Sequence, residues 1–145
     1  MLAARPRSET QLREQLMSKQ WTNPRLVDDC IGRLKEMGYI DDAHFAESYA
    51  SHRLRAKPIG RARLGRELAL RKVDRKTIDR ALDQVFDETA EDALIDRAIQ
   101  KHIRTHGRPT DRRDGKRMFD HLVRLGFEFD LIIHKLDALR RETIK

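Results

Sequence analysis

The sequence predicts an all-α protein made of tandem helical repeats. One spacing of apolar residues, with steps of four, five, five and four, occurs three times along the 145 residues. The three copies are Leu12, Leu16, Trp21, Leu26 and Cys30; Leu64, Leu68, Val73, Ile78 and Leu82; and Met118, Leu122, Phe127, Ile132 and Leu136. Steps of four keep side chains on one helix face, and steps of five pass over a short connector. Each copy should therefore form helix, turn and helix, and no stretch alternates as a strand would.

Turn and cap residues place the helices of the first copy. Ser8 is expected to cap a helix through Leu12 and Leu16, with Gln11 completing a capping box. The dipeptide Asn23-Pro24 should begin the next helix, because proline is favoured in a first turn. That helix is expected to end near Gly38.

Further signals place the remaining helices. The pair Asp41-Asp42 should cap a helix through residue 54, and Pro58 with Gly60 should end it. In the second copy Asp74 is expected to cap one helix, which ends around residue 86, and Thr89 the next. We therefore expect repeat 1 at residues 1–57, repeat 2 at 58–104, a linker at 105–115 and a truncated repeat 3 at 116–145, whose last helix ends near residue 139.

Composition limits the class of protein. A single cysteine excludes a disulfide framework, and Cys30 is interpreted as a small core residue because Leu82 and Leu136 share its register. Trp21, Val73 and Phe127 share the corner position and are interpreted as wedges between two helices. No segment reaches the roughly 18 uninterrupted apolar residues of a membrane span, and no signal-peptide core is present. We expect a soluble, cytoplasmic protein that is monomeric and binds no membrane.

Positive charge is concentrated in one window. Residues 53–76 hold ten basic and two acidic residues, a net charge of +8 against +7 for the whole chain. Such a cluster favours a polyanionic or acidic partner, although a solvated helix face has a similar composition. The expected partner-binding and nucleic-acid-binding residues are Arg53, Arg55, Lys57, Arg61, Arg63, Arg66, Arg71 and Lys72.

Catalytic and metal-binding patterns are weak. His102 and His106 are four apart and could share a metal, but no third ligand has a suitable spacing. Asp41 and Asp42 are explained more simply as helix caps than as a catalytic pair. No Walker, nucleophile-elbow or zinc-protease motif occurs. We expect no catalytic residues, no metal and no cofactor.

Several motifs resemble the RecX family of bacterial regulators of the recombinase RecA. They are Gly-Tyr-Ile-Asp-Asp-Ala-His-Phe-Ala-Glu at 38–47, Ser-His-Arg at 51–53, Gly-Arg-Ala-Arg-Leu-Gly-Arg-Glu-Leu at 60–68 and Lys-Val at 72–73. Arg-Ser-Glu at 7–9 and Leu-Gly-Phe at 125–127 resemble the family's first and last repeats. His44 stands where the family commonly has arginine, and Arg61 where it has proline. Lys72 replaces the glycine that usually ends a helix, so that turn is expected to be built differently or strained.

The resemblance implies three tandem three-helix repeats in an elongated, curved array. Similar proteins bind the helical groove of the RecA filament on single-stranded DNA and lower RecA's ATPase, strand-exchange and coprotease activities, which damps the SOS response. Members usually carry one more helix before the Arg-Ser-Glu segment, so we expect a helix missing at the N-terminus and a start codon upstream. A stand-alone DNA-binding protein of helix-turn-helix type remains the alternative, and would bind duplex DNA alone.

Overall fold

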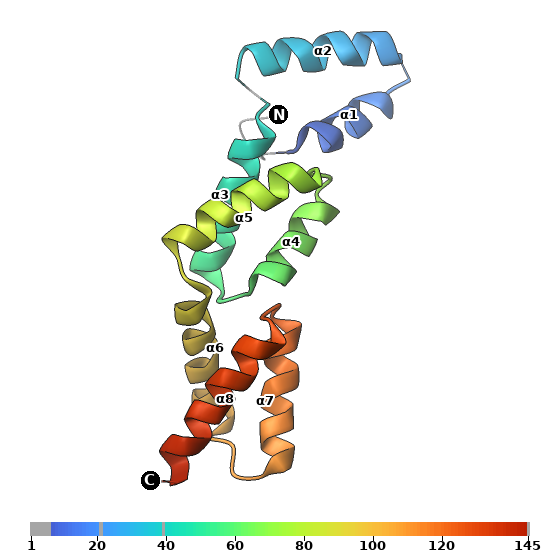
Figure 1. Cartoon of the computed structure of the whole chain (residues 1–145). Helices are drawn as coiled ribbons and strands as arrows, with labels where there is room; N and C mark the ends of the chain where they lie inside the picture. Colours follow the sequence, from blue (N-terminus) through green and yellow to red (C-terminus); the bar gives the residue numbers. More distant parts are fainter. Residues whose placement is uncertain (1–6, 21, 39, 145) are drawn as a thin grey trace.

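The structure is a computed structural model that describes residues 7–20, 22–38 and 40–144. The described residues form helices and no strand, which confirms the all-α fold class. The helices are α1 Glu9–Met17, α2 Pro24–Glu36, α3 Asp42–Ala56, α4 Arg61–Leu70, α5 Arg75–Glu88, α6 Glu91–His106, α7 Arg112–Arg124 and α8 Phe129–Ile144. Figure 1 shows an elongated molecule with α1 and α2 at one end and the group α6, α7 and α8 at the other. No helix in the described part of the chain is long and apolar enough to span a membrane.

Packing arranges the helices in three groups: α1 with α2, α3 with α4 and α5, and α6 with α7 and α8. α3 packs most extensively on α5, and α8 is tied to α6 by Lys135, whose Nζ lies 3.0 Å from carboxylate oxygens of Asp92 and Asp96. The expected boundary between residues 57 and 58 therefore falls inside a packed group, because α3 covers the helix pair that follows it. In the same way α6 completes the last group, so the third copy does not lack a helix. The segment between α6 and α7 spans only residues 107–111, and α8 continues to Ile144.

The repeated apolar positions form the core of the second and third copies. All five positions of the second copy are buried, as are the first four of the third. The corner residues Val73 and Phe127 are 6% and 3% exposed, which supports their interpretation as wedges between two helices. Trp21, the corner residue of the first copy, lies outside the described residues.

The first copy departs from the pattern, and the expectation for Cys30 is wrong. Cys30 is exposed and Leu26 is 50% exposed, whereas Val27 and Ile31 are buried in their place. The reason is the length of the connection. Seven positions separate Leu16 from the helix cap Asn23, against six from residue 68 to the cap at 74, so the buried stripe of α2 shifts by one residue.

The expected caps are mostly correct. Ser8, Asn23, Asp41 and Asp74 each accept a hydrogen bond from a first-turn backbone N–H, and Ser8 forms the capping box with the residue at position 11. Thr89 is not a cap of α6: its backbone N–H closes the end of α5, and α6 begins after residue 90.

Helices α4 and α7 end in the same turn, with a glycine in one and a lysine in the other. In α7 the N–H of Phe127 donates to the carbonyl of Leu122, and Gly126 adopts φ +94°. In α4 the N–H of Val73 donates to the carbonyl of Leu68, and Lys72 adopts φ +68°. Both are Schellman turns, which require a left-handed residue. The expected strain at Lys72 is therefore present, although the turn keeps its usual form.

Replacing Lys72 with glycine is expected to stabilise the protein. A left-handed side-chain-bearing residue costs about 1–2 kcal/mol, and the greater unfolded-state entropy of glycine offsets part of the gain. The free energy of unfolding in urea should rise by roughly 0.5–1 kcal/mol. Arg71→Gly is the control, because Arg71 has φ −90° and gains nothing from glycine. Equal or lower stability of Lys72→Gly would contradict the strain argument.

A backbone junction joins the second and third helix groups. The N–H of Gly60, the cap residue of α4, donates to the carbonyl of Leu125 at 2.8 Å, and the N–H of Ala62 donates to the carbonyl of Gly126 at 3.3 Å. A Cβ on Gly60 would lie 2.3 Å from the carbonyl oxygen of Gly126. Only glycine lets the two main chains approach this closely.

The same junction recurs between the first and second groups in another form. Ser8, the cap of α1, is buried, and its hydroxyl donates to the carbonyl of Arg71, the last residue of the α4 turn, at 2.6 Å. Asp42 supports it by accepting the N–H of Glu9 at 2.8 Å. The start of the first helix of each pair thus docks on the turn of the following pair. This repetition produces the elongated array.

Candidate nucleic-acid interface

The eight basic residues expected to bind a partner occupy the end of α3 and the whole of α4. Arg53 and Arg55 lie in the last turn of α3, and Lys57 is its final cap. Of the other residues, Arg61, Arg63 and Arg66 lie in the ten-residue helix α4, Arg71 is its C-terminal cap, and Lys72 lies in the turn that follows. A helix of ten residues is about 15 Å long, so the basic residues at the start and at the end of α4 contact different parts of the molecule.

Glu67 gathers part of the set around one carboxylate. Arg53 donates to it twice, at 2.7 Å from Nε and 3.2 Å from Nη2, and the Tyr49 hydroxyl donates at 2.8 Å. Arg63 Nε lies 3.6 Å from Oε2 of Glu67. Burial raises the pKa of Glu67, but the hydrogen bonds and positive charges around it outweigh burial and hold the pKa below its ordinary value. Arg53 and Arg63 therefore have an internal partner already.

Further members of the set are also paired within the molecule. Arg61 lies 2.7 Å from Asp83 of α5, and Lys72 lies 3.9 Å from Glu14 of α1. The Arg71 guanidinium lies over the Tyr49 ring, 4.5 Å from its centroid. The structure thus does not bring the eight residues together as one open cluster.

Four members of the set, Arg55, Lys57, Arg66 and Arg71, have no ion pair to any described residue, and of these Arg71 lies over the Tyr49 ring. Arg55 and Arg66 are exposed. Lys57 is half-buried, and burial together with the charges of Arg63 and Lys101 lowers its pKa. Lys101 belongs to α6, so positive charge continues from the second helix group onto the third.

The structure adds residues that the sequence did not indicate. His102 of α6 stacks on His106, with ring centroids 4.5 Å apart, and contacts His121 of α7, with centroids 5.1 Å apart. Among the described residues no group of three or more histidine, cysteine or acidic side chains is placed to hold a metal ion. The spacing of four in the sequence predicted only that His102 and His106 lie together. His121 joins them because α7 packs on α6.

The histidine cluster, His102, His106 and His121, lies in a positive environment. Burial lowers the pKa of His102, and the charges of His106 and Arg117 add to this effect. Burial also lowers the pKa of His121, with contributions from His102 and Arg124. Both imidazoles therefore favour the neutral form in the folded protein.

Acidification is therefore expected to destabilise the fold before the carboxylates titrate. The unfolded chain binds protons at its histidines around pH 6.5, whereas His102 and His121 resist protonation in the folded protein, so stability should fall as pH drops below about 6.5. Melting temperatures at about pH 8 and about pH 5.5 measure the effect. A His102→Gln/His121→Gln variant should show a smaller pH dependence, and an unchanged dependence would contradict the role of these two groups.

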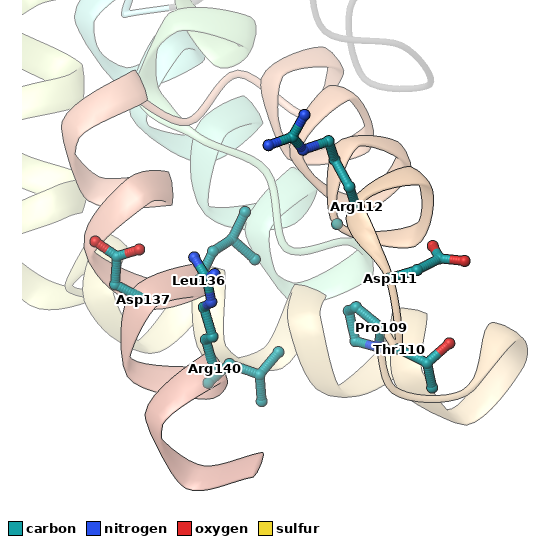
Figure 2. A pocket seen from close by; sticks show the side chains of 9 residues that line it. Pro109, Thr110, Asp111, Arg112, Leu136, Asp137 and Arg140 are labelled. Carbon is teal, nitrogen blue, oxygen red and sulfur yellow. The ribbon is translucent and has the colours of Figure 1, made fainter. Parts of the chain in front are cut away.

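One cavity lies apart from this surface. It has a volume of about 500 Å³ and lies between the start of α7 and α8. In Figure 2, Leu136, Asp137 and Arg140 of α8 line it on one side and the segment from Pro109 to Arg112 on the other. Its side chains mix both charges with apolar groups, so it does not extend the positive surface.

The chain is similar in sequence to proteins of one family. Residues 41–82 match the family described as RecX, second three-helix domain, which covers α3, α4 and the first part of α5. Regulatory protein RecX of Thermobifida fusca is 29% identical over 142 residues, 95% of this chain and 76% of the relative. Regulatory protein RecX of Listeria innocua is 35% identical over 77 residues, 53% of this chain and 28% of the relative.

Two solved structures share the fold. A crystal structure of regulatory protein RecX superposes with a TM-score of 0.76 at 22% identity and covers 90% of this chain and 63% of that one. The crystal structure of RecX from Lactobacillus salivarius superposes with a TM-score of 0.81 at 19% identity and covers 94% and 90%. The order of three-helix groups seen here is thus that of a known fold.

Proposed function

Because the chain belongs to the RecX family of regulatory proteins, we propose that it binds RecA and its filament on single-stranded DNA and lowers RecA's recombinase, ATPase and coprotease activities. It acts by binding, without chemistry of its own and without a cofactor. Its place in the cell is the cytoplasm, where it meets RecA as a monomer. The match of residues 41–82 to the second three-helix domain of RecX carries this proposal.

The shape and charge of the molecule support binding to a filament. An elongated row of helix groups can contact several protomers at once, which raises affinity without a deep pocket. Arg55 and Arg66 are the exposed members of the positive surface on α3 and α4, and half-buried Lys57 with Lys101 of α6 continues it toward the third helix group. Such a surface suits an acidic face of RecA or the phosphates of its DNA.

A stand-alone helix-turn-helix DNA reader is the second candidate. Arg75, Lys76 and Arg80 are exposed in the first turns of α5, the position from which a recognition helix contacts bases. This candidate requires tight, sequence-dependent binding to duplex DNA in the absence of RecA. The RecA modulator requires only weak, salt-sensitive DNA binding.

The ATPase rate of the cognate RecA on single-stranded DNA, with this protein titrated in, tests the proposal. The rate should fall at substoichiometric protein, and Arg55→Glu/Arg66→Glu should raise the concentration for half-inhibition by about tenfold or more, equivalent to about 1.4 kcal/mol of binding energy. Both side chains are exposed, so the melting temperature should not change. Arg63 is unsuitable for this test because it packs beside Gly126 and Glu67.

Lys19→Glu/Arg25→Glu is the matched control, since it makes the same charge change at exposed residues of the first helix group. It should inhibit RecA like the unmodified protein. Absence of inhibition by the unmodified protein, together with tight binding to bare duplex DNA, would favour the DNA reader.

A further inference from the structure

The histidine cluster is a site of unusual composition. Its three rings are in contact from His106, which is exposed and stacks on His102, through His102, which is 8% exposed, to the half-buried His121, whose ring is tilted by 33° to that of His102. The rings come from two helices, so the stack spans the contact between α6 and α7. It therefore presents one ring to solvent while the ring below it is held in place.

Positive groups approach the cluster from each element around it. Lys57 comes from the end of α3, and Arg117 and Arg124 come from α7 itself. Lys101 of α6 and Arg63 of α4 act on Lys57 in turn. The charge of Arg117 lowers the pKa of His102, and the charges of Arg124 and Lys57 lower the pKa of His121, whereas Glu67 raises the pKa of Lys57. Lys57, Arg117 and Arg124 thus surround the rings with positive charge from two different elements.

We propose that His102, His106 and His121 form a proton-linked binding site for the phosphate backbone of single-stranded nucleic acid. A phosphodiester carries a permanent negative charge and accepts hydrogen bonds from imidazolium, ammonium and guanidinium groups, which are the donors present here. Each imidazole that becomes protonated adds one such donor. Binding of the backbone therefore draws protons onto the cluster.

The exposed ring of His106 is the reason for proposing a single-stranded ligand rather than a duplex. An unstacked base can lie on an aromatic or imidazole face, and such contacts are typical of single-strand binding. His106 offers this face at the outer end of the stack.

The inference deepens the proposed function, and rests on it for the relevance of single-stranded DNA. It is tested without RecA, so the two can fail separately. If the protein binds DNA with the expected pH dependence but does not inhibit RecA, only the proposed regulatory function is wrong. If it inhibits RecA but its DNA binding does not depend on pH, only the proposed histidine site is wrong.

The test is the affinity for a labelled oligothymidylate, measured by fluorescence anisotropy at constant salt. Neither thymine nor the phosphodiester titrates between about pH 6 and about pH 8, so any change in affinity over this range comes from the protein. Affinity should rise as pH falls, by roughly tenfold for each histidine whose pKa increases by one unit on binding. A His102→Gln/His106→Gln/His121→Gln variant should lose this pH dependence and keep the affinity seen at about pH 8.

His134→Gln is the control variant, because His134 is exposed on α8 and outside the cluster. It should keep the full pH dependence. The histidine resonances, followed by NMR, should titrate at higher pH once the oligothymidylate is bound, which packing of α6 on α7 alone does not produce.

Equal affinity at both pH values for the unmodified protein would overturn the proposal, as would a pH dependence that survives in the triple variant. In a further experiment, inorganic pyrophosphate replaces the oligothymidylate. If pyrophosphate shifts the histidine titrations and the oligothymidylate does not, the site binds a small phosphate compound, and the proposal is wrong.

Discussion

Gly126→Ala is expected to lower the free energy of unfolding by about 2–5 kcal/mol. Its Cβ would lie 2.4 Å from the backbone nitrogen and from the Cβ of Arg63, and its φ of +94° disfavours any side chain. Because the obstacle is main chain, α4 must move away from the α7–α8 turn. This movement breaks the hydrogen bond from Ala62 and the one from Gly60.

Gly115→Ala is the matched control for this substitution. Gly115 lies inside α7, and a Cβ there has no neighbour within 4 Å. Alanine should therefore stabilise the helix by about 0.5–1 kcal/mol. Urea unfolding followed by circular dichroism measures both variants. An unchanged midpoint for Gly126→Ala would show that the close approach of α4 to this turn is not needed for stability.

Glu67→Ala is expected to move stability and nucleic-acid affinity in opposite directions. Removing the carboxylate leaves Arg53, Arg63 and the Tyr49 hydroxyl without their common acceptor in a half-buried place, which should cost about 1–2 kcal/mol of stability. The same change frees two guanidinium groups for phosphate. The affinity for oligothymidylate should rise, and its dependence on salt should steepen by about one phosphate contact.

Asp87→Ala separates this effect from net charge alone. Asp87 is exposed on α5, and its removal makes the same change in net charge. It should alter stability little and raise the affinity less than Glu67→Ala. A Glu67→Ala variant that binds the oligothymidylate no better than the Asp87→Ala variant would show that the freed arginines do not face the ligand.

The contribution of Glu67 is also expected to depend on pH. Its pKa is lowered in the folded protein, so its stabilising effect is present above the unfolded value of about 4.3 and is lost as pH falls through the folded value.

Local features of the fold were predictable from the sequence because they depend on neighbouring residues. The caps at Ser8, Asn23, Asp41 and Asp74 follow from side chains that reach the first turn of their own helix. The buried positions of the second copy follow from the helical period. Cys30 was misplaced because one additional residue in the preceding connection shifts the register of α2, and the spacing of apolar residues does not distinguish the two registers.

Features that depend on distant residues were not predictable. Nothing in the spacing decides whether α3 packs on the pair before it or on the pair after it. The charge count of residues 53–76 is correct, yet it does not show that Glu67 and Asp83 already pair with members of the set. His121 is likewise separated from His102 by a loop, and only the packing of α7 on α6 brings the rings together.

The separate hydrophobic cores give the molecule two cooperative units of unequal size. The helices from α3 to α8 share one continuous core, whereas the described residues of α1, α2 and the segment before α3 form a separate, smaller core of Leu12, Val27, Ile31 and Ile40, against which Leu16 and Leu34 pack. So small a core supplies little stability by itself. Local unfolding of the first pair therefore requires little more than release of the Ser8 and Glu9 hydrogen bonds, and leaves the remainder folded. We therefore expect amide hydrogen exchange to be faster in α1 and α2 than in the helices from α3 to α8.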